Sequence, residues 1–152
     1  MNHRISAGAL VENNGRLLLV RHRKQAAYDF WVAPGGGVQG AESLLAAAER
    51  EVREETGLVV VAERILYIEE FHNPETRHCK FWLQARLVGG ELSVEAPEAT
   101  AEYIVDAAWH TEDQINTLQV FPEFLQARYW QDRKAGFPSG LQYMGLRAMD
   151  FW

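Results

Sequence analysis

Two short apolar runs, 6–11 and 16–20, flank the dipeptide Asn14-Gly15 near the start of the chain. Asn-Gly between apolar runs is a strong signal for a two-residue turn that joins antiparallel strands. The pattern therefore predicts a β-hairpin. Further apolar runs predict strands at 30–33, 58–62, 65–71, 80–88 and 103–109.

Residues 42–56 carry apolar side chains at helical spacing instead. Those that fall on one face are Leu44, Leu45, Ala48 and Val52. Gly57 follows, where the end of a helix favours a positive φ. Shorter helices are expected after Thr111, which begins a capping-box sequence, and from Pro122 to Gly136. Strands and helices mixed in this order predict an α/β class, with helices covering a mixed sheet.

The stretch 141–152 is unusually apolar and contains Tyr143, Met144, Phe151 and Trp152. A segment of this kind is expected to dock on its own domain or on a partner subunit.

Composition narrows the class of protein. A chain of 152 residues, 47% hydrophobic and 24% charged, has the size and make-up of one globular domain rather than a disordered segment. Its net charge of −6 argues against binding to nucleic acid. Cys79 has no second cysteine to pair with. The first residues lack the long apolar stretch of a signal peptide, and no apolar run approaches the ~18 residues that span a bilayer. These features together predict a cytoplasmic protein without membrane contact.

Three glutamates mark the helix predicted at 42–56. Glu51, Glu54 and Glu55 fall within an arc of roughly 100°, beside the apolar stripe rather than opposite it. Converging carboxylates repel one another unless a cation lies among them, and Mg²⁺ prefers carboxylate ligands that join it to phosphates. The alternative is a solvated acidic face, partly neutralised by Arg50 and Arg53.

The glycines before the helix favour the first interpretation, since they let a phosphate or metal approach the backbone closely. The segment reads Gly36, five residues, Glu42, seven residues, Arg50-Glu51-Val52, one residue, Glu54-Glu55, one residue, Gly57-Leu58. This pattern resembles the complete signature of the Nudix hydrolase family, the Nudix box, at 36–58. The chain also has the length and element order of a single Nudix domain, 1–152. The resemblance implies the Nudix fold, an α/β/α sandwich around a mixed β-sheet.

A competing interpretation is a dinucleotide-binding turn, because Gly35, Gly37 and Gly40 fit its glycine spacing. Pro34 directly precedes the first of these glycines, and a dinucleotide site has no need of the helix glutamates. The Nudix interpretation is therefore preferred.

The resemblance implies a metal-dependent hydrolase. Nudix enzymes cut the pyrophosphate of a nucleoside diphosphate linked to another moiety, with Mg²⁺ or Mn²⁺. Carried onto this sequence, the main metal ligands are Glu54 and Glu55, joined by Glu51 and the carbonyl of Gly35. Arg50 would hold a catalytic glutamate in place. The implied catalytic residues are thus Glu51, Glu54 and Arg50, with the choice of general base among the glutamates left open.

Other candidates lie outside the helix. Many members add a carboxylate about forty residues past the box, where Glu98 and Glu102 both lie, and Glu102 is favoured. Substrate contacts are expected from Arg21 and Arg23 at a strand end and from Trp31 as a stacking ring. Glu42 is expected in a supporting role at the substrate site.

The substrate class stays open at this stage. Pro74 lies sixteen positions past Leu58, a spacing associated with Nudix proteins that hydrolyse ADP-ribose. It slightly favours ADP-ribose or a nucleotide sugar over the alternative, a nucleoside triphosphate. A non-catalytic sensing domain is a third interpretation, against which the full set of glutamates argues. The expected partners are a small nucleotide and, since homodimers are common in the family, a second copy of the chain.

Overall fold

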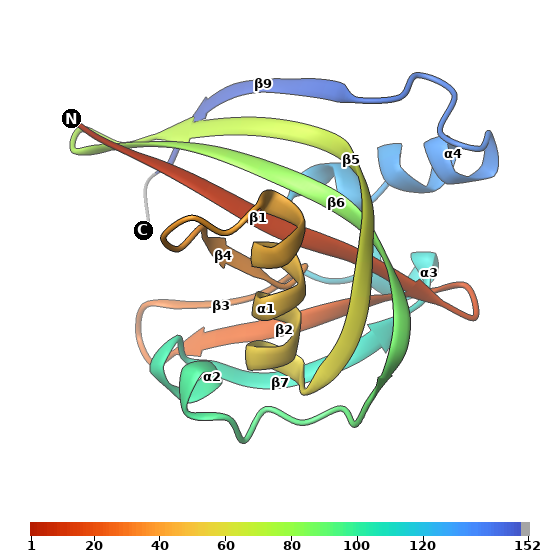
Figure 1. Cartoon of the computed structure of the whole chain (residues 1–152), viewed down its shortest axis with the longest axis horizontal. Coiled ribbons are helices and arrows are strands. Elements are labelled where there is room, and N and C mark those ends of the chain that lie inside the picture. The colour runs from red at the N-terminus through yellow and green to blue at the C-terminus, as the bar shows by residue number, and fades with distance from the viewer. Residues whose placement is uncertain (150–152) are drawn as a thin grey trace.

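A computed structural model describes residues 1–149 (Figure 1). The strands are β1 (Asn2–Asn13), β2 (Arg16–Lys24), β3 (Tyr28–Val32), β4 (Gly35–Gly37), β5 (Leu58–His72), β6 (Thr76–Gly90), β7 (Ile104–His110), β8 (Val120–Phe121) and β9 (Gln142–Ala148). The helices are α1 (Leu44–Thr56), α2 (Pro97–Ala101), α3 (Glu112–Ile115), the 3₁₀ turn η1 (Glu123–Leu125) and α4 (Arg128–Lys134).

Within this part of the chain the strands form one curled, mixed sheet in the order β8-β3-β2-β1-β6-β5-β9, with β4 paired to β1 and β7 to β2. The predicted hairpin turns at Asn14-Gly15, but β1 and β2 pair only next to the turn. Further along, β1 pairs in parallel with β6 and antiparallel with β4, while β2 turns to β3 and β7. The divergence of the two strands opens the sheet around a central space.

Two hydrophobic clusters cover the two faces of the sheet. One packs α1 against the sheet through Ala47, Ala48 and Val52. The other contains Leu125 and Trp130, from η1 and α4. Helices on both faces of a mixed sheet confirm the predicted α/β class and the Nudix fold.

Several predicted boundaries were wrong. The runs 58–62 and 65–71 belong to one strand, β5, which absorbs the interruption in the pattern as shifts of register. Residues 35–37 form a further strand, β4, and β2 continues past the predicted end at residue 20 to Lys24. The helix expected from Pro122 to Gly136 is divided into η1 and α4. The Leu125 carbonyl there accepts a hydrogen bond from the Trp130 indole (2.9 Å).

The apolar stretch near the end of the described residues docks on its own chain. Strand β9 pairs in parallel with β5 along the edge of the sheet. Phe151 and Trp152 lie outside the described residues, and the expected homodimer stays a prediction. No helix in the described part is long and apolar enough to cross a membrane.

Candidate active site

Helix α1 is held tightly at both ends. At its start the Ser43 hydroxyl accepts a hydrogen bond from the Ala46 amide (3.1 Å). At its end Gly57 adopts a φ of 74°, and a Cβ there would lie 2.4 Å from the Glu91 carbonyl oxygen. Only glycine satisfies both constraints. The helix therefore presents a fixed set of side chains to the space inside the curl.

Three carboxylates converge beside this helix. Glu51 and Glu55 are buried, with 4% and 1% of their surface exposed, because they flank the apolar stripe that packs on the sheet. Glu102, directly after α2, completes the group and is exposed. One carboxylate oxygen from each residue lies within 4.8 Å of the others, a spacing that could hold a metal ion.

The electrostatics of this group favour a cation. Burial raises the pKa of Glu55 well above its usual value, and the charges of Glu102 and Glu51 add to the rise. Burial likewise raises the pKa of Glu51, against the opposing effect of Arg50, and the pKa of Glu102. Three crowded acids of this kind are stabilised when a divalent ion shares them. The donor set therefore fits a divalent metal ion that prefers oxygen ligands.

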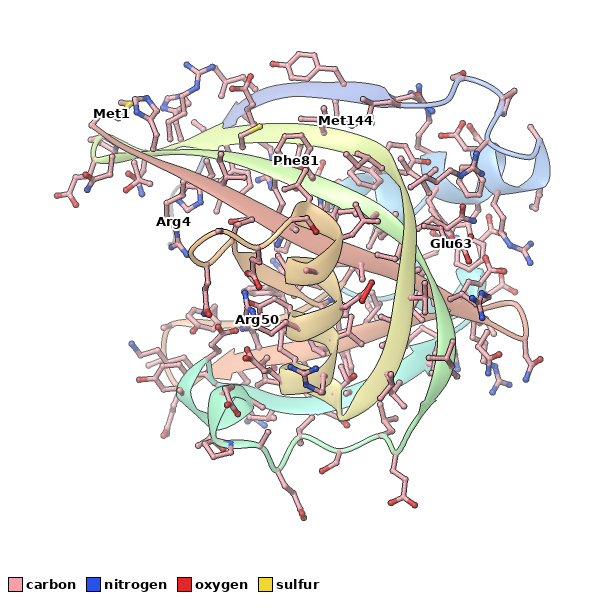
Figure 2. All side chains as sticks on the ribbon, viewed as in Figure 1. Met1, Arg4, Arg50, Glu63, Phe81 and Met144 are labelled. Atoms are coloured by element: carbon pink, nitrogen blue, oxygen red, sulfur yellow. The ribbon has the colours of Figure 1, made fainter. Side chains whose placement is uncertain are left out.

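Arg50, on α1 (Figure 2), makes hydrogen bonds to several of the neighbouring glutamates. Its Nη1 donates to Glu51 (2.9 Å) and to Glu54 (3.0 Å). Its Nε and Nη2 bind both oxygens of Glu42, at 3.1 and 2.7 Å, and Nη2 also reaches the Gly37 carbonyl (3.0 Å). One guanidinium thus joins the helix to the loop that precedes it.

The glycines of β4 allow the carboxylates to approach the sheet. The Gly35 amide donates to both oxygens of Glu55, each at 3.3 Å. A Cβ on Gly36 would lie 2.5 Å from Oε1 of Glu51, and one on Gly35 would lie 2.6 Å from the Cα of Gly8. No larger residue fits at these two positions without moving the site.

A cavity of about 310 Å³ opens beside the carboxylates and shares Glu102 with them. Arg4, His78 and Lys80 contribute basic groups to its lining, and Tyr28, Phe71 and Tyr103 contribute rings. A more polar cavity lies on the other side of Arg4 and Glu102, where Glu51 lines it. Glu102 therefore lines both cavities, one of which has aromatic and basic walls.

Sequence reasoning missed Lys80 and His22. Lys80 is partly buried, and its ammonium lies 4.3 Å from the centre of the Trp82 ring. Burial lowers its pKa, opposed by the carboxylates of Glu69, Glu55 and the rest of the acidic group. The available signal was strand alternation, which places residue 80 on the same face as Trp82.

His22 is buried against the segment that carries Glu102. Its Nδ1 lies 3.1 Å from the Glu102 carbonyl oxygen, and burial lowers its pKa to about 4. The ring is therefore neutral at physiological pH and helps to fix the backbone of Glu102.

Three residues expected to contact the substrate lie outside the cavity lining, whereas Glu42 makes a supporting salt bridge with Arg50. Arg21 makes a two-bond ion pair with Asp29 (2.8 Å each), and Arg23 lies 4.0 Å from the same carboxylate. Trp31 packs on His110, with ring centres 4.5 Å apart, and Glu42 is occupied by Arg50. These four are absent from the lining of the described cavity. Alternation along β2 and β3 explains the three strand residues, since His22 and Phe30 take the inward positions.

The remaining candidates divide clearly. Glu102 joins the carboxylate group, whereas Glu98 is exposed on α2. Glu54 is not among the three converging residues. It is bonded to Arg50, yet it lies close enough to raise the pKa of Glu51 and Glu102.

Comparison with known proteins gives consistent matches. A family model described as NUDIX domain matches residues 2–134. The chain is 30% identical over 132 residues to 8-oxo-dGDP phosphatase NUDT18 of Danio rerio, covering 86% of this chain and 33% of that protein. It is 25% identical over 101 residues to ADP-ribose pyrophosphatase of Methanocaldococcus jannaschii, covering 65% and 60%. It thus spans less than two thirds of either relative.

Among solved structures, a NUDIX hydrolase from Nitrosomonas europaea superposes with a TM-score of 0.71 at 24% identity. The match covers 89% of this chain and 90% of that one.

Proposed function

The chain belongs to the Nudix hydrolase family, and we propose that it hydrolyses the pyrophosphate bond of a nucleoside diphosphate derivative. One observation carries the proposal: the Glu51–Glu55–Glu102 group lies at the edge of a cavity lined by basic and aromatic side chains. Two relatives, one named as an 8-oxo-dGDP phosphatase and the other as an ADP-ribose pyrophosphatase, support this substrate class.

Within this proposal Glu51, Glu55 and Glu102 hold Mg²⁺ or Mn²⁺. Glu54, which is bonded to Arg50 in the structure, would be a further ligand. The Gly35 carbonyl would be another. An ion held there would supply charge to neutralise phosphate oxygens and would lower the pKa of an attacking water. The Gly35 amide keeps the Glu55 carboxylate in its orientation.

The protein residues supply the rest of the mechanism. Arg4 and Lys80 line the cavity as cations and are placed to contact the phosphates. Glu51 Oε1 is bonded to Arg50, so we assign Oε2 to accept the proton of the attacking water. A carboxyl whose pKa is raised by burial suits that task, because proton transfer is most efficient when the pKa approaches the working pH.

A hydrolysis screen tests the function. The purified protein is assayed with Mg²⁺ and with Mn²⁺ on 8-oxo-dGDP, ADP-ribose, UDP-glucose, diadenosine diphosphate and the nucleoside triphosphates. We expect turnover of one or more nucleoside diphosphate derivatives. Glu55→Gln should lose activity on the order of 10³-fold, because a neutral amide replaces a charged ligand.

Glu49→Gln is the matched control on the same helix. Glu49 accepts a hydrogen bond from the Ala62 amide (3.3 Å), which the glutamine oxygen can also accept, so activity should be retained. Turnover of triphosphates alone would contradict the proposed substrate class. If no substrate were cleaved with either metal, the proposal that the protein is a hydrolase of these compounds would be contradicted.

A further inference from the structure

A segment beyond the family match lines a small cavity next to the main one. The NUDIX model ends at residue 134, whereas β9 begins at Gln142. A small cavity of about 30 Å³ adjoins the main one and shares Val32, Phe71 and Lys80 with it. Arg147 of β9 and Met149, just after it, line this small cavity.

Strand β9 is fixed in place by a regular set of bonds. Its register places Arg147 opposite Phe71 of β5, and the Met149 amide donates to the His72 carbonyl (2.9 Å). The Tyr143 hydroxyl donates to Glu70 (2.7 Å). The position of Arg147 is therefore a property of the fold rather than of a free tail.

Arg147 connects the two edges of the curled sheet. Its guanidinium carbon lies 5.3 Å from the Phe71 ring centre on β5 and 6.0 Å from that of Phe121 on β8. Strands β8 and β9 are the opposite ends of the sheet order. The guanidinium thus closes the gap between them behind the cavity.

The polar groups at this wall are paired with one another. Glu69 is buried, accepts a hydrogen bond from the Trp82 indole (3.1 Å) and lies 3.7 Å from Nε of Arg147. The carboxylate and guanidinium offset each other's charge. Apart from Lys80, which the two cavities share, this end offers a ligand ring faces and the Met149 side chain.

We propose that Arg147 and Met149 form a specificity-determining wall that limits the size of the group attached to the pyrophosphate. The inference rests on the proposed function, in which the carboxylate end binds the pyrophosphate. The space behind Phe71 and Lys80 is about 30 Å³, too small for a further ring. With the wall intact, the group attached to the pyrophosphate must end before Phe71, and a shorter side chain at 147 or 149 would let a longer group enter.

The test is a substrate profile of Arg147→Ala and of Met149→Ala. Steady-state kcat and KM are measured for each substrate that the wild type cleaves, including ADP-ribose and diadenosine diphosphate. We expect the ratio of kcat/KM between the bulkiest and the smallest substrate to rise at least fivefold in both variants. The change should lie mainly in KM, with kcat for the smallest substrate held within about twofold.

Two controls separate this role from a structural one. Arg147→Lys retains the cation and should keep a near-native profile. Arg86→Ala removes another strand arginine, paired with Glu63 (3.1 Å) on the exposed surface, and should change nothing. A merely structural contribution would lower the Tm and reduce all substrates alike.

Each outcome decides between the two proposals. An active wild type with an unchanged profile in both variants overturns the wall and leaves the proposed function standing. A wild type that cleaves no substrate overturns both.

Discussion

The two ends of the cavity are built in opposite ways. The carboxylate end takes Glu51 and Glu55 from one continuous segment, the Nudix box at 36–58. The far end gathers Glu69, Phe121 and Arg147 from three strands distant in sequence. The carboxylate end holds like charges together, whereas the far end pairs its charges internally. The residues for a reaction shared by a family can thus come largely from one short segment. The residues proposed to select the substrate come instead from strands that include both ends of the sheet, β8 and β9.

Among the tests of this contrast, we expect the largest effect from Gly36→Ala. A Cβ at this position would lie 2.5 Å from Glu51 Oε1, so the carboxylate must move. A displacement of about 1 Å in a catalytic group costs on the order of 10²-fold in rate, and we expect a loss of that size in kcat. Gly89→Ala is the control, since nothing lies within 4 Å of its Cβ position. Near-native activity in Gly36→Ala would show that the carboxylates need no glycine-lined wall.

The second prediction concerns Arg50→Met. The substitution removes five hydrogen bonds, to Glu42, Glu51, Glu54 and the Gly37 carbonyl, and leaves partly buried carboxylates without a cation. We expect about 2 kcal/mol of lost stability in urea denaturation. Activity should fall at least tenfold. Arg53→Met, on the exposed side of the same helix, should leave both unchanged. Equal stability of the two variants would contradict the organising role of Arg50.

The smallest effect is expected in protein stability, measured in EDTA, when one carboxylate at each end of the cavity is replaced. Because the pKa of Glu55 is raised in the folded state, folding favours its protonated form, and stability falls as pH rises above the ordinary glutamate pKa. Glu55→Gln removes this cost, so we expect it to exceed the wild type in stability at pH 8, by on the order of 1 kcal/mol, with the difference shrinking toward pH 4.

Glu69→Gln at the far end is the counterpart and should be less stable than the wild type by about 1 kcal/mol, since its partners Trp82 and Arg147 lose a charged acceptor. Thermal unfolding of both variants across pH measures the comparison. If both substitutions changed the stability in the same direction, the two ends would not differ in how they hold a carboxylate.

The sequence allowed the carboxylate end to be predicted because its determinants are short-range. Helical spacing places Glu51 and Glu55 beside the buried stripe, and Gly57 ends the helix. The choice of Glu102 over Glu98 came from the resemblance, and in the structure a turn with Tyr103 at φ 60° directs the chain inward there.

The rest depended on pairing between distant strands. Arg21, Arg23 and Trp31 were assigned to the substrate because of their residue type, but the face of a strand on which a residue lies is set by its partners. Lys80 and Arg147 reach the cavity only because β1 pairs with β6 and β5 with β9. No spacing within the sequence specifies those partners. The short helix α2 and the strand character of 142–148 were missed for the same reason.

Gly57 alone joins α1 to β5, and this short connection restricts which changes of sequence the protein can accept. Strand β5 starts directly after Gly57 and takes up three shifts of register against β6 before Tyr67, after which it pairs regularly with β6 to His72. The helix that carries the glutamates and the far wall are thus connected by one strand. Inserting one residue between 67 and 70 would turn every later side chain of the strand to the opposite face. We expect insertions and deletions to be excluded there and tolerated at the 73–75 turn. Natural or engineered changes of substrate range should therefore arise through substitutions around 147–149 rather than through changes in the length of β5.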